Sequence, residues 1–408
     1  MFSQDRSLAP SLDPAALAAT LRPFGESQML PRAAYVDPAT FAWEQENFFA
    51  GDWICVGRSA EVATPRDQRA ESVGAAGVLL VRGDDGALRA FANTCRHRGH
   101  ELLGCGTSVN RRAVVCPYHS WTYALDGSLH SVTGGRFADR PGFQPERWGL
   151  VELPTREWHG LVMVDGSGRA PPFEDRVATL EPIVAPYEME RLAVAGTHSY
   201  TVRSNWKTLT ENYHECYHCP MIHPELCRVS PPTSGQNYDP GGGGWVGGWM
   251  ELRDGMQTMS LDGHSGGVAL RGLKGKALRE VVYVNVFPNL VISLHPDYAM
   301  VHRLTPLAVD RTQVECTWWF APEAVERADF DPAYAVEFWD ITNRQDWAAC
   351  ESVQRGLAST HAVPGPLAGE EHAVYQFVTM VARGYLGQPI GGTAAAPARQ
   401  RPTEPVVG

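Results

Sequence analysis

The sequence predicts an α+β protein in which a small all-β unit precedes a larger unit of antiparallel strands and helices. Short β-like runs follow one another closely between Trp53 and about residue 165, which is typical of a small all-β unit. Strand-like runs then recur from residue 281 to 320 with no helical pattern between them, which favours one antiparallel sheet. Two long helical patterns, Tyr334–Leu357 and Glu370–Tyr385, follow this sheet.

The elements of the first unit appear in a simple order. Residues 1–35 form a polar, proline-containing lead-in, and the apolar spacing of residues 36–50 predicts a helix. Asp84-Asp85-Gly86 and Asp126-Gly127 are tight-turn signals between β-like runs. The predicted strands are Trp53–Val56, Gly77–Arg82, Leu88–Asn93, Ala113–Cys116, Trp121–Leu125 and Leu161–Val164.

The second unit begins near residue 180. Tyr200–Arg203 is strand-like, and the run from Trp206 to His218 predicts a helix capped by Ser204 or Asn205. The glycine-rich stretch 236–248 predicts a mobile loop. The sheet strands are expected at Val281–Leu294, Met300–Leu304 and Gln313–Phe320. The expected divisions are a lead-in at 1–35, a first domain at 36–170, a second domain at 180–390 and a disordered tail at 391–408.

Composition excludes several classes of partner. The 408 residues include 35 Lys and Arg and 46 Asp and Glu, a formal net charge of −11, which argues against nucleic acid or an anionic membrane as the main partner. No run of 18 apolar residues predicts a membrane span, and Met1 to Leu12 lack the apolar core of a secretory signal. We therefore expect a cytoplasmic protein. Its nine cysteines favour metal ligation or burial over a disulfide framework.

The first constellation of chemical residues lies in the all-β unit. Cys95 and His97 are followed, after 18 residues, by Cys116 and His119. Two loops that each present one thiolate and one imidazole can form a four-ligand metal site. Zinc would take all four ligands around one ion, whereas a Rieske [2Fe–2S] cluster would place both cysteines on one iron and both histidines on the other.

The second constellation lies in the stretch from Glu211 to Pro224. Glu215 and His218 are three residues apart and would share one face of a helix. Pro220 would end that helix, so that His223 could return to the same metal. Two histidines and one carboxylate make the facial triad of a non-haem Fe(II) oxygenase, which leaves positions open for dioxygen and substrate.

Both constellations resemble those of Rieske non-haem iron oxygenase α subunits, members of the aromatic-ring-hydroxylating dioxygenase superfamily. The first matches in Cys-x-His and Cys-Pro-Tyr-His-x-Trp, with Arg98-Gly99-His100 typical of the oxygenase branch. The second matches in Asn205-Trp206-Lys207 and in Glu-Asn-Tyr-x-Glu-Cys-Tyr-His-Cys-x-x-x-His-Pro, which runs from Glu211 to Pro224.

The resemblance implies further assignments. It places the third iron ligand on Asp346, with Asp340 on the same predicted helix as the alternative. It also implies a helix-grip catalytic domain and a head-to-tail homotrimer. In that trimer Glu215 would join His218 to His119 of the neighbouring subunit, beside the iron.

The same resemblance implies the cofactors and the redox partner. Electrons would reach the [2Fe–2S] cluster one at a time and pass to Fe(II), where O2 is reduced beside a small-molecule substrate. The chain has no convincing dinucleotide-binding glycine motif and no ferredoxin-type four-cysteine run. We therefore expect a separate flavin- or ferredoxin-type reductase that takes electrons from NAD(P)H.

Glu215, in the context Glu-Cys-Tyr-His-Cys, resembles the branch that acts on quaternary ammonium compounds such as glycine betaine and carnitine. The expected reaction is hydroxylation or N-demethylation of a methylated amine. A trimethylammonium group is held by ring faces, and the candidates are Tyr238, Trp245 and Trp249, with Phe287 or Tyr298 on the sheet. The alternatives are an aromatic-ring hydroxylase and a non-catalytic electron carrier or zinc protein.

The remaining cysteines and aromatic residues near these motifs have ordinary explanations. Cys216, Cys219 and Cys227 are expected to be buried small side chains. The others, expected in packing or loop positions, are His100, His214, Tyr213 and Tyr217.

Overall fold

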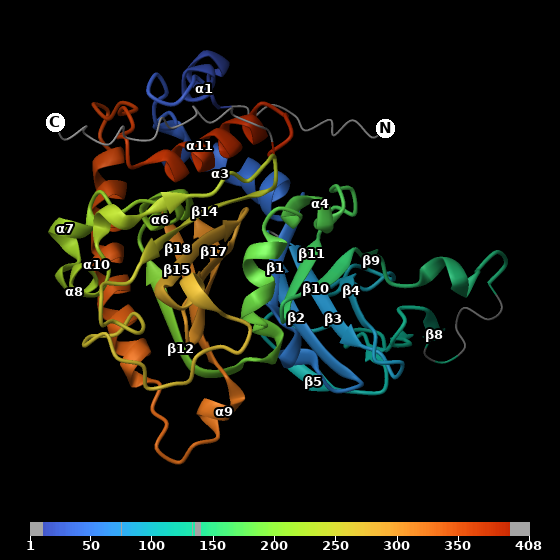
Figure 1. Cartoon of the computed structure of the whole chain (residues 1–408). Helices are drawn as coiled ribbons and strands as arrows, with labels where there is room; N and C mark the ends of the chain where they lie inside the picture. Colours follow the sequence, from blue (N-terminus) through green and yellow to red (C-terminus); the bar gives the residue numbers. More distant parts are fainter. Residues whose placement is uncertain (1–10, 75, 133, 135–139, 392–408) are drawn as a thin grey trace, which may run out of the picture.

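The computed structural model describes residues 11–74, 76–132, 134 and 140–391 (Figure 1). A seven-stranded antiparallel sheet forms the centre of the second half of the chain, and three smaller sheets form the first half. The large sheet lies between the long helix α10 (Ala333–Leu357) and the smaller sheets (Figure 1). This is the α+β arrangement that the sequence predicts.

The described residues of the first half form eleven strands, in sheets ordered β1-β11-β10, β5-β2-β3-β4-β9 and β6-β7-β8. Each predicted strand of this half is present, although the two that flank Cys116 and His119 are reduced to two residues each. The strands are β1 (Trp53–Arg58), β2 (Asp67–Val73), β3 (Ala76–Arg82), β4 (Leu88–Ala92), β5 (Ser108–Asn110), β6 (Val114–Val115), β7 (Thr122–Tyr123), β8 (Leu129–Ser131), β9 (Glu152–Leu153), β10 (Thr155–Trp158) and β11 (Leu161–Asp165).

Strand β2 is absent from the sequence-based prediction because its residues are mostly polar. It lies between β5 and β3 in its sheet, so polar side chains on it become buried. Glu71 is one of them, and its carboxylate lies 2.6 Å from Arg69 Nη2 and 3.0 Å from Arg303 Nη1. Arg303 belongs to the second half, so the partner that permits this burial is distant in sequence.

The seven-stranded sheet has the order β12-β18-β17-β16-β15-β14-β13, and all pairs are antiparallel. The predicted antiparallel sheet is confirmed, but the run expected as one strand at Val281–Leu294 is two strands, β15 and β16, joined by a turn. The strands are β12 (Ala193–Val202), β13 (Gln236–Asn237), β14 (Trp245–Glu251), β15 (Glu280–Val286), β16 (Leu290–Leu294), β17 (Tyr298–Ala308) and β18 (Arg311–Phe320).

The prediction of a loop over the whole stretch 236–248 was wrong. Gly247 and Gly248 lie inside β14, where a Cβ would come 2.4 Å from the carbonyl oxygens of Tyr283 and Gln236 respectively. These glycines permit close strand packing.

The long helices α10 and α11 (His372–Tyr385) occupy the positions that the sequence predicts. Asn205 caps α6 (Trp206–Tyr213) by accepting a hydrogen bond from the N–H of Lys207 at 3.1 Å. The other α-helices are α1 (Pro14–Thr20), α2 (Ala33–Val36), α3 (Pro38–Glu44), α4 (Phe173–Val177), α5 (Glu181–Val184), α7 (Cys219–Ile222), α8 (Pro224–Val229) and α9 (Pro322–Val325).

Shorter helical turns complete the described secondary structure. A π-helical turn at Gln45–Phe49 extends α3. Short 3₁₀ turns lie at Ser59–Val62, Pro145–Trp148, Ala185–Tyr187, Met189–Arg191, Pro232–Ser234 and Gly275–Arg279. Within the described segments, no helix combines the length and the apolar character needed to cross a membrane.

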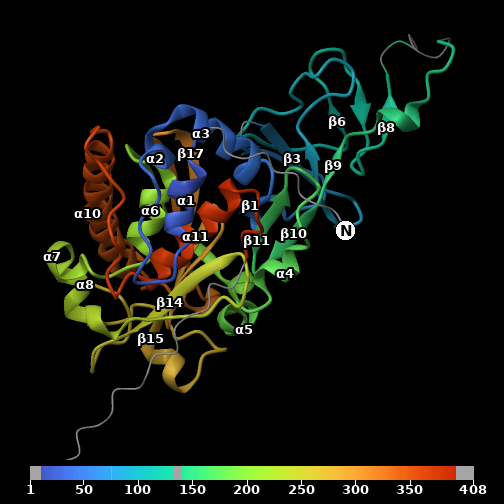
Figure 2. The ribbon, with the colours of Figure 1, turned by 90° about the horizontal axis from the view of Figure 1, so that it is seen from above.

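The segment read as a lead-in packs against the second half of the chain. Figures 1 and 2 show α1 beside α11. Leu17 and Leu30 are buried in a core that also contains Phe377 of α11. The N–H of Met29 donates to the carbonyl of Gly365 at 3.0 Å. Most of the tail expected at 391–408 lies outside the described residues.

Specific polar contacts join the two halves. Asn289 lies between β15 and β16, and its amide both accepts from the N–H of Cys55 and donates to its carbonyl, each at 2.9 Å. Arg303 donates to Glu71 and to the carbonyl of Val56, at 3.0 and 3.1 Å. These contacts hold the small sheets against the large sheet. Helices α7 and α10 lie at one end of the molecule, and β8 lies at the other (Figures 1 and 2).

Candidate metal centres

Two loops of the first half present the cysteine and histidine pairs, and both loops close in the same way. The N–H of Cys95 donates to the carbonyl five residues later at 2.8 Å, and its carbonyl accepts from the N–H four residues later at 3.0 Å. Cys116 makes the matching bonds at 2.9 and 3.0 Å. The fourth residues, Gly99 and Ser120, have positive φ angles of 71° and 56°. A serine with a positive φ angle is strained, so the surrounding loop must hold Ser120 in this conformation.

The four side chains of these loops divide into an inner and an outer pair. Cys95 and Cys116 are buried, and the Cys95 Sγ lies 3.2 Å from the hydroxyl of Tyr123. His97 and His119 are half-exposed, with ring centroids 4.7 Å apart. No three ligand atoms of this set, all of them in described residues, lie within 4.8 Å of one another. Two buried thiolates and two outer imidazoles, too spread for one zinc ion, fit a two-iron cluster.

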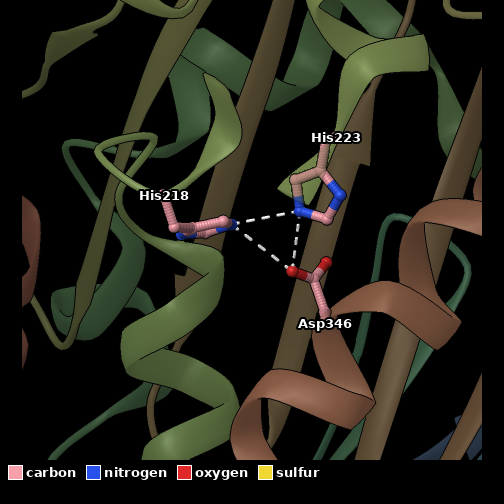
Figure 3. A group of neighbouring side chains, drawn as sticks. All are labelled: His218, His223 and Asp346. Atoms are coloured by element: carbon pink, nitrogen blue, oxygen red, sulfur yellow. Dashed lines mark hydrogen bonds and ion pairs between the residues drawn. The ribbon is translucent and has the colours of Figure 1, made fainter. Parts of the chain in front are cut away.

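The second centre is a compact group of three side chains. His218 Nε2 and His223 Nε2 are 3.1 Å apart, and Asp346 Oδ1 lies 3.4 and 2.8 Å from them respectively (Figure 3). Metal–ligand bonds of about 2.1 Å at right angles place adjacent ligand atoms about 3 Å apart. The observed separations fit one metal ion bound on one face by two imidazoles and a carboxylate.

The Nδ1 atoms of His218 and His223, which point away from the shared centre, also form hydrogen bonds. His218 Nδ1 donates to the Glu215 carboxylate, and His223 Nδ1 donates to Gln345 Oε1 at 2.7 Å. These bonds leave each Nε2 free to accept a metal ion. Gln345 was missed by the sequence-based reading, although its position directly before Asp346 on α10 was a usable signal.

The alternative ligand Asp340 has other partners. Its carboxylate accepts a hydrogen bond from the Tyr200 hydroxyl and one from Arg344 Nε, both at 2.7 Å. The structure brings Asp346, and not Asp340, to the two histidines. Hydrogen bonds from Arg344 and Tyr200 keep the pKa of Asp340 below its usual range, despite burial.

The predicted helix from Trp206 to His218 was too long. Helix α6 ends at Tyr213, and Glu215 lies in a turn between α6 and α7. The Glu215 carboxylate accepts hydrogen bonds from the N–H groups of Tyr217 and His218, at 2.6 and 3.2 Å, and so competes with helical bonding. Glu215 and His218 therefore meet through this turn, and not through a shared helix face.

A disulfide joins Cys216 to Cys219 across the same turn. Cys219 is buried, as expected, and Cys216 is half-buried, but the disulfide between them was not predicted. Their Cα atoms are 4.9 Å apart, so the bond encloses Tyr217 and His218 in a short loop. Cys227 remains a free thiol and donates to the carbonyl of Cys219 at 3.4 Å.

Negative charge is concentrated at the three-residue centre. Burial alone would lower the pKa of His218, but hydrogen bonds to Asp346 and Glu215 raise it to about 9. The pKa of His223 is also raised by Asp346, against the effect of burial. Both histidines must lose these protons to bind a metal ion, so metal binding at this centre should release protons.

A cavity of about 550 Å³ opens beside the triad. This volume falls within the range of sites that bind small molecules. All three triad residues line it, and so do five aromatic side chains: Phe24, Tyr213, Trp249, Tyr283 and Trp339. Phe24 comes from the segment read as a lead-in, which no pattern in the sequence connected to the site.

Of the three residues expected in the substrate pocket, Trp249 lines this cavity, and Tyr238 and Trp245 do not. Trp245 is fully buried in a core against which Trp249 also packs, and its indole N–H donates to the Thr179 hydroxyl at 3.0 Å. Tyr238 packs against the same core. Phe287 and Tyr298 are fully buried and do not line the cavity either.

The sequence matches two families. Residues 52–136 match the Rieske [2Fe-2S] domain, and residues 189–387 match the ring hydroxylating alpha subunit (catalytic domain). The two matches cover the two halves that carry the two centres.

Individual relatives agree with these matches. The glycine betaine monooxygenase oxygenase subunit of Pseudomonas aeruginosa (strain UCBPP-PA14) is 32% identical over 391 residues, which cover 88% of this chain and 90% of the relative. The carnitine monooxygenase oxygenase subunit of Escherichia coli (strain K12) is 36% identical over 202 residues, which cover 49% and 53%. A crystal structure of the quaternary ammonium Rieske monooxygenase CntA superposes with a TM-score of 0.75 at 25% identity, covering 92% of this chain and 99% of that one.

Proposed function

Because the chain belongs to the Rieske non-haem iron oxygenases, we propose that its two centres are the cluster site and the iron site of one oxygenase subunit. The proposed ligands are Cys95, His97, Cys116 and His119 for the [2Fe–2S] cluster, and His218, His223 and Asp346 for Fe(II). When bound, these groups supply one-electron transfer and the reduction of dioxygen. The chain is thus an oxidoreductase that consumes O2.

The substrate is a methylated, quaternary amine, and the observation that carries this assignment is the aromatic cavity beside the triad. Tyr213, Tyr283 and Trp339 line this cavity together with the three proposed iron ligands. Ring faces attract a trimethylammonium cation without forming a bond to it. Hydroxylation of a methyl group on nitrogen gives a hemiaminal, which loses formaldehyde and leaves the demethylated amine.

The residues of the chain position the substrate and control protons. The Glu215 carboxylate holds the His218 ring by its Nδ1–H, which fixes the orientation of the ligand nitrogen. Asn212 Nδ2 lies 3.5 Å from His218 Nε2, at the cavity wall. The aromatic walls exclude water from the methyl group that reacts.

The active assembly is a head-to-tail homotrimer in this proposal. Helix α10, which carries Asp346, and strand β6, which precedes Cys116 and His119, lie far apart in the molecule (Figure 2), which argues against electron transfer within one chain. Large apolar side chains are exposed at both ends: Tyr217 and Met221 beside His218, and Tyr118 beside His119. Joining these surfaces would place Glu215 between His218 and His119 of the neighbouring subunit.

Electrons would come from a separate flavin- or ferredoxin-type reductase that oxidises NAD(P)H. A cytoplasmic location remains a prediction from the sequence. The comparisons favour the quaternary ammonium branch over an aromatic-ring hydroxylase.

A single-turnover assay tests the proposed function. The protein is loaded with iron, reduced chemically and exposed to dioxygen with choline, betaines, carnitine or aromatic acids. We expect formaldehyde and a demethylated amine from at least one methylated amine. A gain of oxygen on an aromatic acid without formaldehyde would instead place the protein among the ring hydroxylases.

A further inference from the structure

The aromatic side chains in the wall of the cavity form two groups. Tyr213, Tyr283 and Trp339 make up the inner group: the ring centroids of Tyr213 and Tyr283 are 5.8 Å apart, and those of Tyr283 and Trp339 are 6.4 Å apart. Tyr213 and Trp339 also line, together with Asp346, a smaller cavity of about 30 Å³. The inner group therefore lies beside the triad. Phe24 belongs to the other group.

Phe24 lies against helix α11. Its ring centroid is 5.0 Å from that of His372 and 5.3 Å from that of Tyr375. His372 lines the cavity as well. Phe24 is half-buried, whereas Pro23 and Gly25 on either side of it are exposed. The chain therefore turns at the surface of the molecule and directs one side chain, that of Phe24, into the cavity wall.

The cavity reaches solvent beside Phe24. The exposed residues among those that line the cavity mark its opening, and Glu370, two residues before His372, is one of them. The others lie between α8 and β14: Thr233, Gly235, Gln236 and Asn237. Because Phe24 packs on His372, it forms part of the α11 side of this opening.

Hydrogen bonds hold the loop that carries Phe24. The Ser27 hydroxyl donates to the carbonyl of Thr20 at 2.6 Å, which closes the loop across its base. The Tyr375 hydroxyl donates to the carbonyl of Arg22 at 3.0 Å, which ties the loop to α11. These bonds fix the loop without a substrate, so a ligand that contacts Phe24 does not need to order it first.

We propose that Phe24 is a specificity-determining residue, whose ring contacts the substituent that a methylated ammonium ion carries on the side away from the iron site. The methylated nitrogen lies among the inner group of rings, and the substituent extends towards the opening. An apolar contact contributes in proportion to the area that it buries, so only ions that reach Phe24 gain from it. The inference rests on the proposed function, since it concerns the substrate of the same iron site.

A graded series of ligands tests the contact. Tetramethylammonium and the ethyl-, butyl- and hexyltrimethylammonium ions share the charged head and differ only in reach. Each is titrated by calorimetry into the iron-loaded, reduced protein without oxygen, and each is then assayed for formaldehyde in a single turnover. We expect Phe24→Ala to change the affinity for tetramethylammonium by less than about two-fold and to weaken the binding of the hexyl ion at least about five-fold.

Two further variants separate a contact with the ligand from a role in folding. Leu21→Ala is the matched control, because Leu21 belongs to the same segment and packs against the core but does not line the cavity. It should lower the melting temperature and leave the dependence of affinity on chain length unchanged. Phe24→Leu keeps an apolar side chain at the opening and should restore most of the affinity for the hexyl ion.

The outcomes separate two failures. If Phe24→Ala changed the affinities for all four ions by the same factor, or tightened the binding of the hexyl ion, the inference would be overturned while formaldehyde release still supported the proposed function. The same length-dependent loss in Leu21→Ala would also overturn it. If none of the four ions bound to the parent protein, the cavity would not be a quaternary ammonium site, and both proposals would fall.

Discussion

The Glu215 carboxylate holds His218 in two ways, through the Nδ1–H of its ring and through its backbone N–H. The same carboxylate also accepts a hydrogen bond from the N–H of Tyr217 at 2.6 Å. One side chain therefore shapes the turn between α6 and α7 and orients a proposed iron ligand. In the trimer that we propose, it would also face the cluster of the next subunit.

Replacing Glu215 with Gln tests that role. A Gln carbonyl can still accept one hydrogen bond from His218, but the amide carries no charge. We expect both metals to stay bound and the substrate-dependent reoxidation of the reduced cluster to slow at least about ten-fold, a change in activation free energy of about 1.4 kcal/mol. Stopped-flow absorbance at the cluster bands measures this rate. Reoxidation at the parent rate would remove the bridging role.

Asp346 is the proposed carboxylate ligand, and Asp340 provides its matched control. Both lie on α10, but only Asp346 lies near the histidines. We expect Asp346→Ala to lose most of the mononuclear iron while the visible spectrum of the cluster is unchanged. Asp340→Ala should keep both. Iron analysis and absorbance decide the matter, and iron retained in the first variant but lost from the second would reverse our assignment.

The Cys216–Cys219 disulfide encloses His218 in a four-residue loop, from Cys216 to Cys219. Closing a loop of this size restricts the unfolded chain by about 2 kcal/mol in the chain-entropy treatment. We expect the double variant Cys216→Ser, Cys219→Ser to release mononuclear iron to a chelator several-fold faster, because the turn that holds His218 is less restrained. The control Cys227→Ser removes a thiol outside the loop. Equal release rates in the three proteins would contradict the expectation.

Glu211 should make stability depend on pH. Burial raises its pKa from 4.5 to about 8, and the Tyr35 hydroxyl donates to it at 2.7 Å. Between these two values the unfolded carboxyl group loses its proton while the folded one keeps it, so the free energy of unfolding falls as pH rises from about 5 to 8, by roughly 1.4 kcal/mol per unit of pKa shift. Above pH 8 this loss is complete.

The variant Glu211→Gln should escape this loss, because a neutral amide also accepts from Tyr35. We expect its melting temperature to exceed that of the parent by a margin that grows between pH 5.5 and 8 and then levels off. Differential scanning calorimetry across that range measures the margin. A margin that is constant with pH would show that Glu211 is ionised in the folded protein.

The sequence predicted those elements and ligands whose signal lies within one short stretch of residues. The β-branched runs of β15 to β18 and the long pattern of α10 could be assigned without tertiary information. So could the spacing of Cys95, His97, Cys116 and His119. The pattern Asn205-Trp206-Lys207 matched the family, but the sequence did not show what these side chains contact. Lys207 forms a buried ion pair with Glu44 at 2.5 Å, and Trp206 donates to the same carboxylate at 2.8 Å.

The rest depended on contacts between distant segments. Strand β2 looks too polar to be buried until Arg303 meets Glu71. Phe24 reaches the cavity only because the first helices pack on α11, where its ring lies 5.0 Å from that of His372. Trp245 and Trp249 both belong to β14, yet only Trp249 lines the cavity. Trp245 is fully buried in a core against which Trp249 also packs, and the sequence does not show which of the two remains accessible.

The contacts of Asn289 with Cys55, and of Arg303 with Glu71, predict that two inactive variants can complement each other. They keep the cluster loops and the iron ligands of one polypeptide apart, so in the proposed trimer each reaction centre draws its two metals from different chains. Two inactive variants should then complement each other. Co-expressed Cys95→Ser chains, which lack the cluster, and Asp346→Ala chains, which lack the iron, should assemble into mixed trimers with intact junctions and partial activity. Each variant alone should have none.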